Sequence, residues 1–163
     1  EVTRTFLPTI AIVLAVNLFL AQPRTVKGES MEPSLHERQR VIVDLLTYRF
    51  REPECGEIIV LKLPNSHSDP LIKRVVALPG ESIEIANGTV YINDRVLEEP
   101  YLTQDTPGYV AKQLVPEEHV FVLGDNRSSS NDSRYFGMVA YEDILGRAWM
   151  RYWPLADVGF FKH

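Results

Sequence analysis

Short apolar runs that end at turn residues fill most of the chain after its first 22 residues. The clearest pair, residues 82–86 and 89–93, alternates in polarity around Asn87-Gly88, a dipeptide that favours the two-residue turn of a β-hairpin. Similar short runs lie at residues 40–46, 57–63, 71–78, 119–124 and 144–153. Strands this short and this regularly spaced predict a mainly β fold, built as an antiparallel barrel or sandwich.

The segment after the hairpin has a different composition. Residues 94–118 are richer in Glu, Asp, Pro and Gly than the runs on either side, which indicates a flap or a small subdomain. With the hairpin, this segment predicts a small inserted β subdomain at about residues 82–118. The main domain, an antiparallel β-barrel-like unit, is expected to cover residues 23–163.

The N-terminal segment contains no charge over residues 6–21. A membrane-spanning helix needs roughly 20 apolar residues, so this segment is at the short edge of that range. Three interpretations stay open: a transmembrane helix, which we favour, a removable secretory signal, which the large side chain of Phe19 disfavours, and a buried core helix. We predict a membrane anchor over residues 1–22. Basic residues flank the segment on both sides, so loop charge does not settle its orientation.

Composition and motifs argue against several classes of function. The net charge of −5 and the pI near 5.4 disfavour a nucleic-acid partner, because phosphate binding needs a basic face. The single cysteine, Cys55, cannot form an internal disulfide. The chain has no H-E-x-x-H, no C-x-x-C and no phosphate-binding glycine loop, and its histidines are scattered. We therefore predict no metal and no cofactor. The G-x-S-x-G motif fails because Glu32 replaces its second glycine.

Lys73 is unusual because it lies in the middle of an apolar strand, where long charged side chains are rare. Alternation places Lys73 on one strand face with Val75 and Ala77, and Arg74 on the other. Either the amine reaches water at a sheet edge, or it is partly desolvated. A desolvated lysine has a lowered pKa and can act as a general base near neutral pH. It can then take the proton of a serine nucleophile.

Two further stretches contain serines in a polar setting. The first, K-G-E-S-M-E-P-S, covers residues 27–34, and the second, L-G-D-N-R-S-S-S-N-D-S-R, covers residues 123–134. Each is compatible with a plain solvated turn. The second also has Arg127 and Arg134 around Asp132, which suits a rigid, ion-paired loop with a hydroxyl left to orient another group.

Taken together, the chain resembles the type I signal peptidases, membrane-bound Ser/Lys proteases that remove secretory signal peptides. The resemblance rests on five stretches in the family's order: G-E-S-M-E-P-S-L (28–35), R-V-I-V (40–43), G-E-I-I-V (56–60), K-R-V-V-A-L-P-G-E (73–81) and G-D-N-R-S-S-S-N-D-S-R (124–134). They cover nearly the whole chain, and the last two are the most distinctive.

The resemblance implies a role for each matching residue. Ser30 is the expected nucleophile, with its backbone N–H as an oxyanion donor, and Lys73 is the expected general base. Ser130 is expected to orient the lysine amine, and Asp132 to pair with Arg134 and Arg74. The remaining matches, expected to shape shallow pockets that accept small side chains of the peptide, are Met31, Leu35 and Ile72. Core packing is the alternative for these three.

Two positions depart from the family pattern. Gly28 lacks the hydroxyl that many relatives add to the oxyanion hole, and Arg38-Gln39 replaces a usual Gly-Asp, which leaves the local turn open. The expected partners are signal peptides of exported preproteins and membrane lipid, with the catalytic domain on the export side. Competing interpretations are a self-cleaving regulator of the related Ser/Lys type, which the acidic charge disfavours, and an inactive relative that only binds exported proteins.

Overall fold

The computed structural model describes residue 8 and residues 20–64 and 69–161. Apart from Pro8 and residues 20–22, the predicted anchor lies outside the described residues. Within these ranges, no helix combines the length and the apolar character that crossing a membrane requires.

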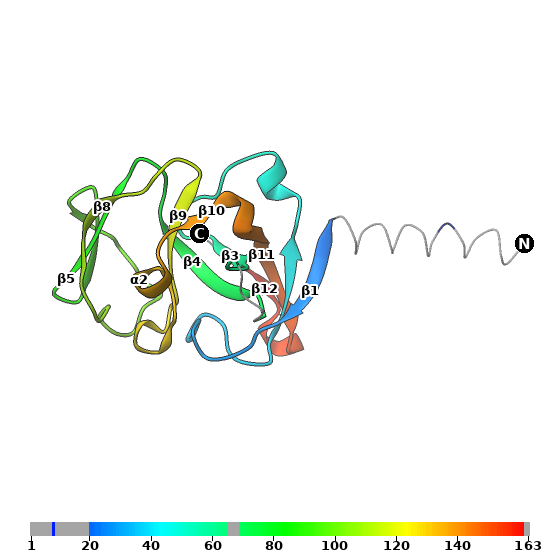
Figure 1. Ribbon diagram of the computed structural model, residues 1–163. Helices are drawn as coiled ribbons and strands as arrows, with labels where there is room; N and C mark the ends of the chain where they lie inside the picture. The colour runs from blue at the N-terminus through cyan, green and yellow to red at the C-terminus, as the bar shows by residue number, and fades with distance from the viewer. Residues whose placement is uncertain (1–7, 9–19, 65–68, 162–163) are drawn as a thin grey trace, which may run out of the picture.

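A large antiparallel sheet forms the main part of the molecule (Figure 1). Its strand order is β1-β2-β11-β3-β4-β9-β10, and β12 pairs with β11. The strands are β1 (Ala21–Thr25), β2 (Arg40–Asp44), β3 (Ile58–Leu61), β4 (Leu71–Ala77), β9 (His119–Leu123), β10 (Val139–Ala140), β11 (Ile144–Trp153) and β12 (Gly159–Phe160). Among the described residues, β1 and β10 each pair on one side only, so the curled sheet is an open half-barrel. The mainly β prediction is confirmed, but the sheet is not closed.

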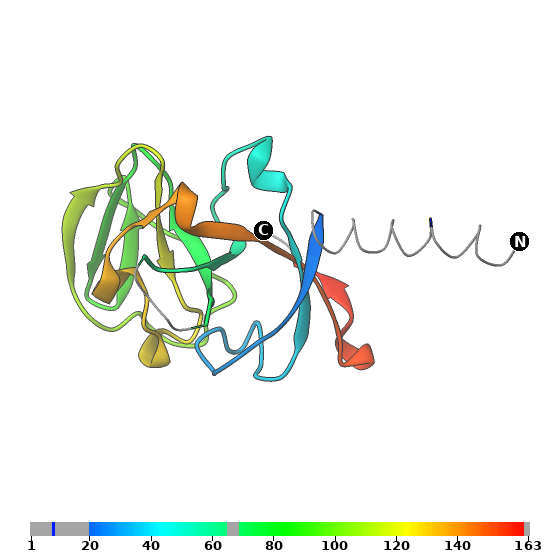
Figure 2. The same cartoon turned by 45° about the vertical axis from the view of Figure 1, so that its right-hand side comes forward.

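A second, four-stranded sheet has the order β7-β6-β5-β8. Its strands are β5 (Ser82–Ala86), β6 (Thr89–Ile92), β7 (Arg95–Val96) and β8 (Val110–Leu114). The predicted hairpin is present, with Ala86 opposite Thr89 and with Asn87 and Gly88 at φ 50° and 80°. This sheet lies within residues 82–118 and at the opposite end of the molecule from β1 (Figure 2).

Short helices fill the connections between strands. They are the 3₁₀ turns η1 (Thr47–Arg49), η2 (Arg127–Ser129), η3 (Tyr141–Asp143) and η4 (Leu155–Asp157), and the α-helix α2 (Ser133–Phe136). The side chain of Asp132 caps α2 by accepting from the backbone N–H of Arg134. Of these elements, η2 and the start of α2 lie in the polar stretch 123–134.

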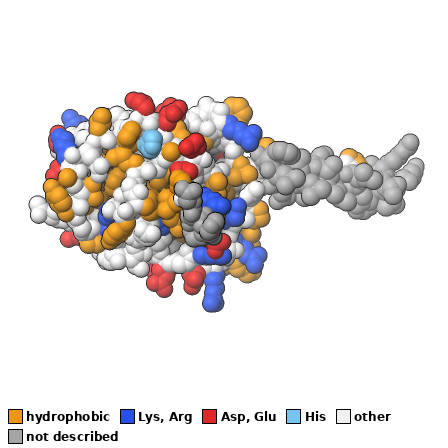
Figure 3. Space-filling model, in the orientation of Figure 1, with side chains coloured by type: hydrophobic (Ala, Val, Ile, Leu, Met, Phe, Trp, Pro, Cys, Tyr) orange, Lys and Arg blue, Asp and Glu red, His pale blue; other side chains and the backbone are white. Residues whose placement is uncertain are grey.

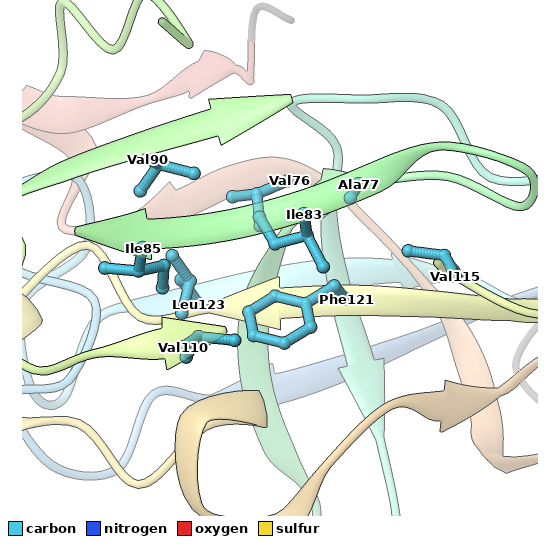
Figure 4. Packing of buried hydrophobic residues seen from close by; sticks show 9 residues of the cluster. All are labelled: Val76, Ala77, Ile83, Ile85, Val90, Val110, Val115, Phe121 and Leu123. Carbon is cyan, nitrogen blue, oxygen red and sulfur yellow. The ribbon is translucent and has the colours of Figure 1, made fainter. Parts of the chain in front are cut away.

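The two sheets share a hydrophobic core in which Val76 and Phe121 of the large sheet meet Ile83 and Ile85 of the small one (Figure 4). Val76 and Ala77 both belong to this cluster, although strict alternation predicted opposite faces for them. The register between β4 and β9 shifts between Val75 and Ala77, and such a bulge brings successive side chains to one side. Strand β4 therefore packs against the small sheet at one end and leaves its other end for the site.

Candidate active site

Ser30 and Lys73 lie side by side, although 43 positions separate them in the sequence. Their Oγ and Nζ atoms are 2.8 Å apart, and the lysine Nζ also lies 3.0 Å from the carbonyl oxygen of Ile72. Lys73 is 3% exposed, so the structure decides for the desolvated alternative. Burial lowers the pKa of the Lys73 ammonium to about 8, against the opposing charges of Asp132 and Asp125.

The main chain around Ser30 is fixed by the loop that follows β9. The backbone N–H of Asn126 donates to the carbonyl of Ser30 at 3.0 Å. Gly124 comes so close that an added Cβ would lie 2.2 Å from Ser130 Oγ and 2.5 Å from the carbonyl oxygen of Ser30. Only a glycine permits this approach, and the close contact sets the position of Ser30 relative to β4.

Asp132 and Arg134 form the ion pair that the sequence predicted. Arg134 Nε lies 2.8 Å from Asp132 Oδ1, and Arg134 Nη2 lies 2.9 Å from Asp132 Oδ2. The same carboxylate accepts from the backbone N–H of Gly124 at 3.0 Å. Because this fully buried carboxylate joins both ends of the loop, it holds residues 124–134 as one rigid unit.

The predicted pairing of Arg74 with Asp132 is wrong. Arg74 instead forms a two-pronged ion pair with Asp125, with Nε–Oδ1 and N–Oδ2 distances of 2.8 and 2.6 Å. The register explains the choice, since Arg74 is opposite Leu123 on β9 and Asp125 follows two residues later. Arg74 also donates to the carbonyl of Gly56 at 2.8 Å, so its buried charge is well compensated.

Ser130 is buried close to the pair but does not make the bond predicted for it. Its hydroxyl lies against Gly124, and among the described residues it has no hydrogen-bond partner. The bonds of the lysine amine go to Ser30 and to the carbonyl of Ile72. The orienting role of Ser130 stays a prediction.

A cleft of about 480 Å³ opens beside the pair. Ser30, Ile72 and Lys73 line it, while Met31 and Leu35 are 1% and 0% exposed and belong to the core beneath β2. Ile72 is therefore the one residue of the three predicted pocket residues that lines this cleft.

Two strand edges border the cleft without a neighbouring strand. Residues 71–73 of β4 pair with β3, but the pairing with β9 starts only at Arg74. On the other wall, Pro23 to Thr25 belong to β1, which pairs only with β2 among the described strands. An extended peptide placed between these edges could form main-chain bonds as an added strand.

Sequence reasoning missed the residues that tie this loop to the segment after β7. Arg127 is 1% exposed and bonds to Glu99, and the guanidinium carbon of Arg74 lies 4.0 Å from the ring centre of Tyr101. Arg127 was noticed in the sequence, whereas nothing in the local pattern marks Glu99 or Tyr101. Only the fold brings them to the site.

No group of three or more His, Cys, Asp or Glu side chains able to hold a metal ion occurs in the described ranges. Acidic and basic side chains are interspersed across the face of the molecule shown in Figure 3.

Comparison with known proteins gives the family. The family model described as "Signal peptidase, peptidase S26" matches residues 1–153. The chain belongs to this signal peptidase family. The resemblance inferred from the five stretches is confirmed, and the chain is a serine-type peptidase of the signal peptidase I group.

Similar family members come from several lineages. The chain is 40% identical over 159 residues to "Signal peptidase I" of Leptolyngbya laminosa, covering 93% of this chain and 78% of that protein. It is 37% identical over 149 residues to "Thylakoidal processing peptidase 1, chloroplastic" of Arabidopsis thaliana, covering 85% of this chain and 44% of that protein. A crystal structure of a signal peptidase I from Enterococcus faecalis matches with a TM-score of 0.53 and 33% identity, covering 60% of this chain and 97% of that one.

Proposed function

We propose that this protein is a membrane-anchored serine endopeptidase that cleaves signal peptides from exported preproteins after a small-x-small motif. Ser30 is the nucleophile and neutral Lys73 is the general base. The observation that carries the proposal is the 2.8 Å approach of Ser30 Oγ to a lysine amine that is almost wholly buried.

The chemistry follows from the protonation state of that amine. When Lys73 is neutral, Nζ accepts the Ser30 proton while Oγ attacks the carbonyl carbon of the scissile bond. The resulting ammonium then gives this proton to the leaving amine, and an acyl-enzyme remains on Ser30. Water, deprotonated by the lysine, attacks the ester; the C–Oγ bond breaks, the lysine returns the proton to Ser30 Oγ, and the signal peptide is released with its new carboxylate. The Ser30 backbone N–H is the proposed oxyanion donor, and Gly28 adds no side-chain donor.

The substrate lies in the cleft as an added strand. The free edges at Pro23–Thr25 and at residues 71–73 support this mode, because main-chain bonds then give affinity while side-chain pockets give specificity. Ile72 borders the space next to Ser30 and restricts it to small side chains. Met31 and Leu35 lie in the core behind this surface and support it from below.

Membrane lipid is the proposed second partner. Residues 1–20 form the anchor, two residues fewer than predicted because Ala21 and Gln22 belong to strand β1, and the catalytic domain faces the export side. Large hydrophobic side chains at the end of β11, in η4 and on β12 are exposed on the described part of the domain: Trp149, Trp153, Leu155, Val158 and Phe160. Aromatic residues of this kind favour the membrane–water interface. In the sheet, only β2 lies between β11 and β1.

The test uses detergent-solubilised protein and a preprotein whose signal ends in Ala-x-Ala. Ser30→Ala and Lys73→Ala are expected to abolish cleavage, whereas Ser129→Ala and Lys62→Ala, at exposed positions, keep it within about 2-fold. For the unmodified protein, kcat/KM is expected to rise about tenfold per pH unit up to about pH 8 and then level, with chelators having no effect. Full cleavage by both substituted proteins would refute the Ser/Lys assignment, and binding without cleavage by the unmodified protein would favour the inactive relative.

A further inference from the structure

Several side-chain bonds fasten the segment between β7 and β8 to the loop at residues 124–134, and those of the Glu99 carboxylate form a buried ion pair among them. Glu99 binds Arg127 through both oxygens, with one N–Oε2 distance of 3.0 Å, and accepts from the hydroxyl of Tyr101 at 2.7 Å. Its side chain is 7% exposed and that of Arg127 is 0% exposed. This is a desolvated ion pair, in which loss of one partner leaves the other charge buried and unpaired.

The first branch from Glu99 leads through Arg127 to the serine side of the site. The Nε of Arg127 donates to the carbonyl of Gly124 at 2.9 Å, and Thr106 Oγ1 accepts a further bond from the same guanidinium. Gly124 is the residue that closely approaches both Ser130 and the main chain of Ser30. The Glu99–Arg127 pair therefore fixes the backbone against which Ser30 rests.

The second branch leads through Tyr101 to the lysine side. The Tyr101 ring lies under the guanidinium of Arg74, with 4.0 Å between the ring centre and the guanidinium carbon, within the range of a cation–π contact. Arg74 directly follows Lys73 in β4. Its ion pair with Asp125 holds the start of the loop at residues 124–134. By holding the tyrosine hydroxyl, Glu99 fixes this ring in place.

We propose that Glu99 is a positioning residue for the peptidase reaction, which aligns Ser30 through Arg127 and Lys73 through Tyr101. The inference rests on the proposed Ser/Lys function. It makes the segment after β7 part of the machinery that places the two reacting groups, in addition to its part in the fold.

The test compares Glu99→Gln, which removes the charge and keeps the shape, with Glu98→Gln at the exposed neighbouring position. We expect Glu99→Gln to lower kcat/KM at pH 7 by about 10- to 100-fold through kcat, with KM changed by less than about 2-fold. We expect Glu98→Gln to stay within about 2-fold of the unmodified protein. Preprotein cleavage is followed from pH 6 to pH 10, well below the unfolding temperature of each variant.

The pH profile separates positioning from simple loss of folded protein. Partial unfolding lowers kcat/KM by the same factor at every pH. A loosened site instead admits water to Lys73, so the rise of kcat/KM on the acid side of the profile moves to higher pH. The charged groups around the lysine are the carboxylates of Asp125 and Asp132, the adjacent Arg74, and Arg24, Lys27 and Asp69 in the same cleft. The substitution alters none of these. The negative charge that it removes would by itself disfavour the ammonium, so a displacement to higher pH reports the position and hydration of the amine.

Tyr101→Phe is the second variant, because it removes the bond to Glu99 and keeps the ring over Arg74. It is expected to move the acid limb in the same direction by a smaller amount, and it decides the matter if Glu99→Gln does not fold. An unmoved limb in the folded variants would overturn the inference. The cleavage test of Ser30→Ala and Lys73→Ala tells the two failures apart. If these variants are inactive and the profile of the Glu99 variant is not displaced, only the role of Glu99 fails. If they are active, the proposed function fails as well.

Discussion

Replacing Lys73 with methionine is expected to abolish cleavage and to remove a pH-dependent cost to stability. The amine is 3% exposed in the folded protein, where burial lowers its pKa from 10.5 to about 8. Each pH unit of difference is worth about 1.36 kcal/mol, so keeping this ammonium buried costs about 3 kcal/mol. Because the folded-state pKa is the lower one, the full cost is present below pH 8 and disappears as the pH rises to 10.5.

Methionine fills a similar volume without a charge, but it loses the contacts to Ser30 Oγ and to the carbonyl of Ile72. At about 1 kcal/mol for each bond, the expected net gain in the free energy of unfolding at pH 7 is about 1 kcal/mol. The pH dependence is the sharper quantity, since the difference between variant and unmodified protein should change by about 3 kcal/mol between pH 7 and pH 11.

The assay is urea unfolding of both proteins at intervals across this range, with Lys62→Met as the control at an exposed lysine next to β3. The control is expected to differ from the unmodified protein by less than about 0.5 kcal/mol at every pH. A difference between Lys73→Met and the unmodified protein that stays flat from pH 7 to pH 11 would refute the desolvated amine, and the general-base role with it.

Three further substitutions test the frame around the site. Gly124→Ala places a Cβ 2.5 Å from the carbonyl oxygen of Ser30 and should lower kcat for preprotein cleavage by about 100-fold. The control is Gly159→Ala, whose Cβ would lie 4.0 Å from its nearest neighbour and should leave kcat unchanged. Asp125→Asn leaves the guanidinium of Arg74 without its carboxylate and should lower the free energy of unfolding by about 3–5 kcal/mol in urea. Arg38→Gly relieves a backbone held at φ 67° and should stabilise by up to about 1 kcal/mol, whereas a destabilisation would show that the arginine side chain matters more.

The predicted strands follow one of two burial patterns. In β5 every second residue is buried, whereas β3 and most of β4 are buried throughout and appear in the sequence as continuous apolar runs. Strand β1 was not predicted, because its residues, A-Q-P-R-T, include a proline and no buried side chain, and the first two of them fell within the predicted anchor. An edge strand tolerates proline, since one side of its backbone needs no partner strand. Strand β8 was missed because only Val110 of its five residues is buried.

The contacts within the candidate site depend on distance in space, and local patterns report them poorly. The buried lysine was a visible anomaly, and Asp132 and Arg134 are only two positions apart, so both could be predicted. The partner of Arg74 could not, because the choice of Asp125 over Asp132 follows from the register of β4 and β9. Glu99 reaches Arg127 only because the small sheet packs on β4 and β9 through the cluster around Phe121. Glu99 and Arg127 are 28 positions apart, and no periodic pattern in the sequence reveals their contact.

Residues 71–73 pair with β3 but not with β9, and this has a consequence for inhibitor chemistry. The Ile72 carbonyl accepts from Lys73 Nζ, and backbone groups of this stretch that face away from β3 can also bond to a ligand in the cleft. A ligand whose main chain is methylated on nitrogen, or which has proline at the facing residue, forfeits a bond there even when every side chain fits. At about 1 kcal/mol for each lost bond, binding should weaken about fivefold per methyl group, and the positions that tolerate methylation would map which amides of the ligand point toward the protein.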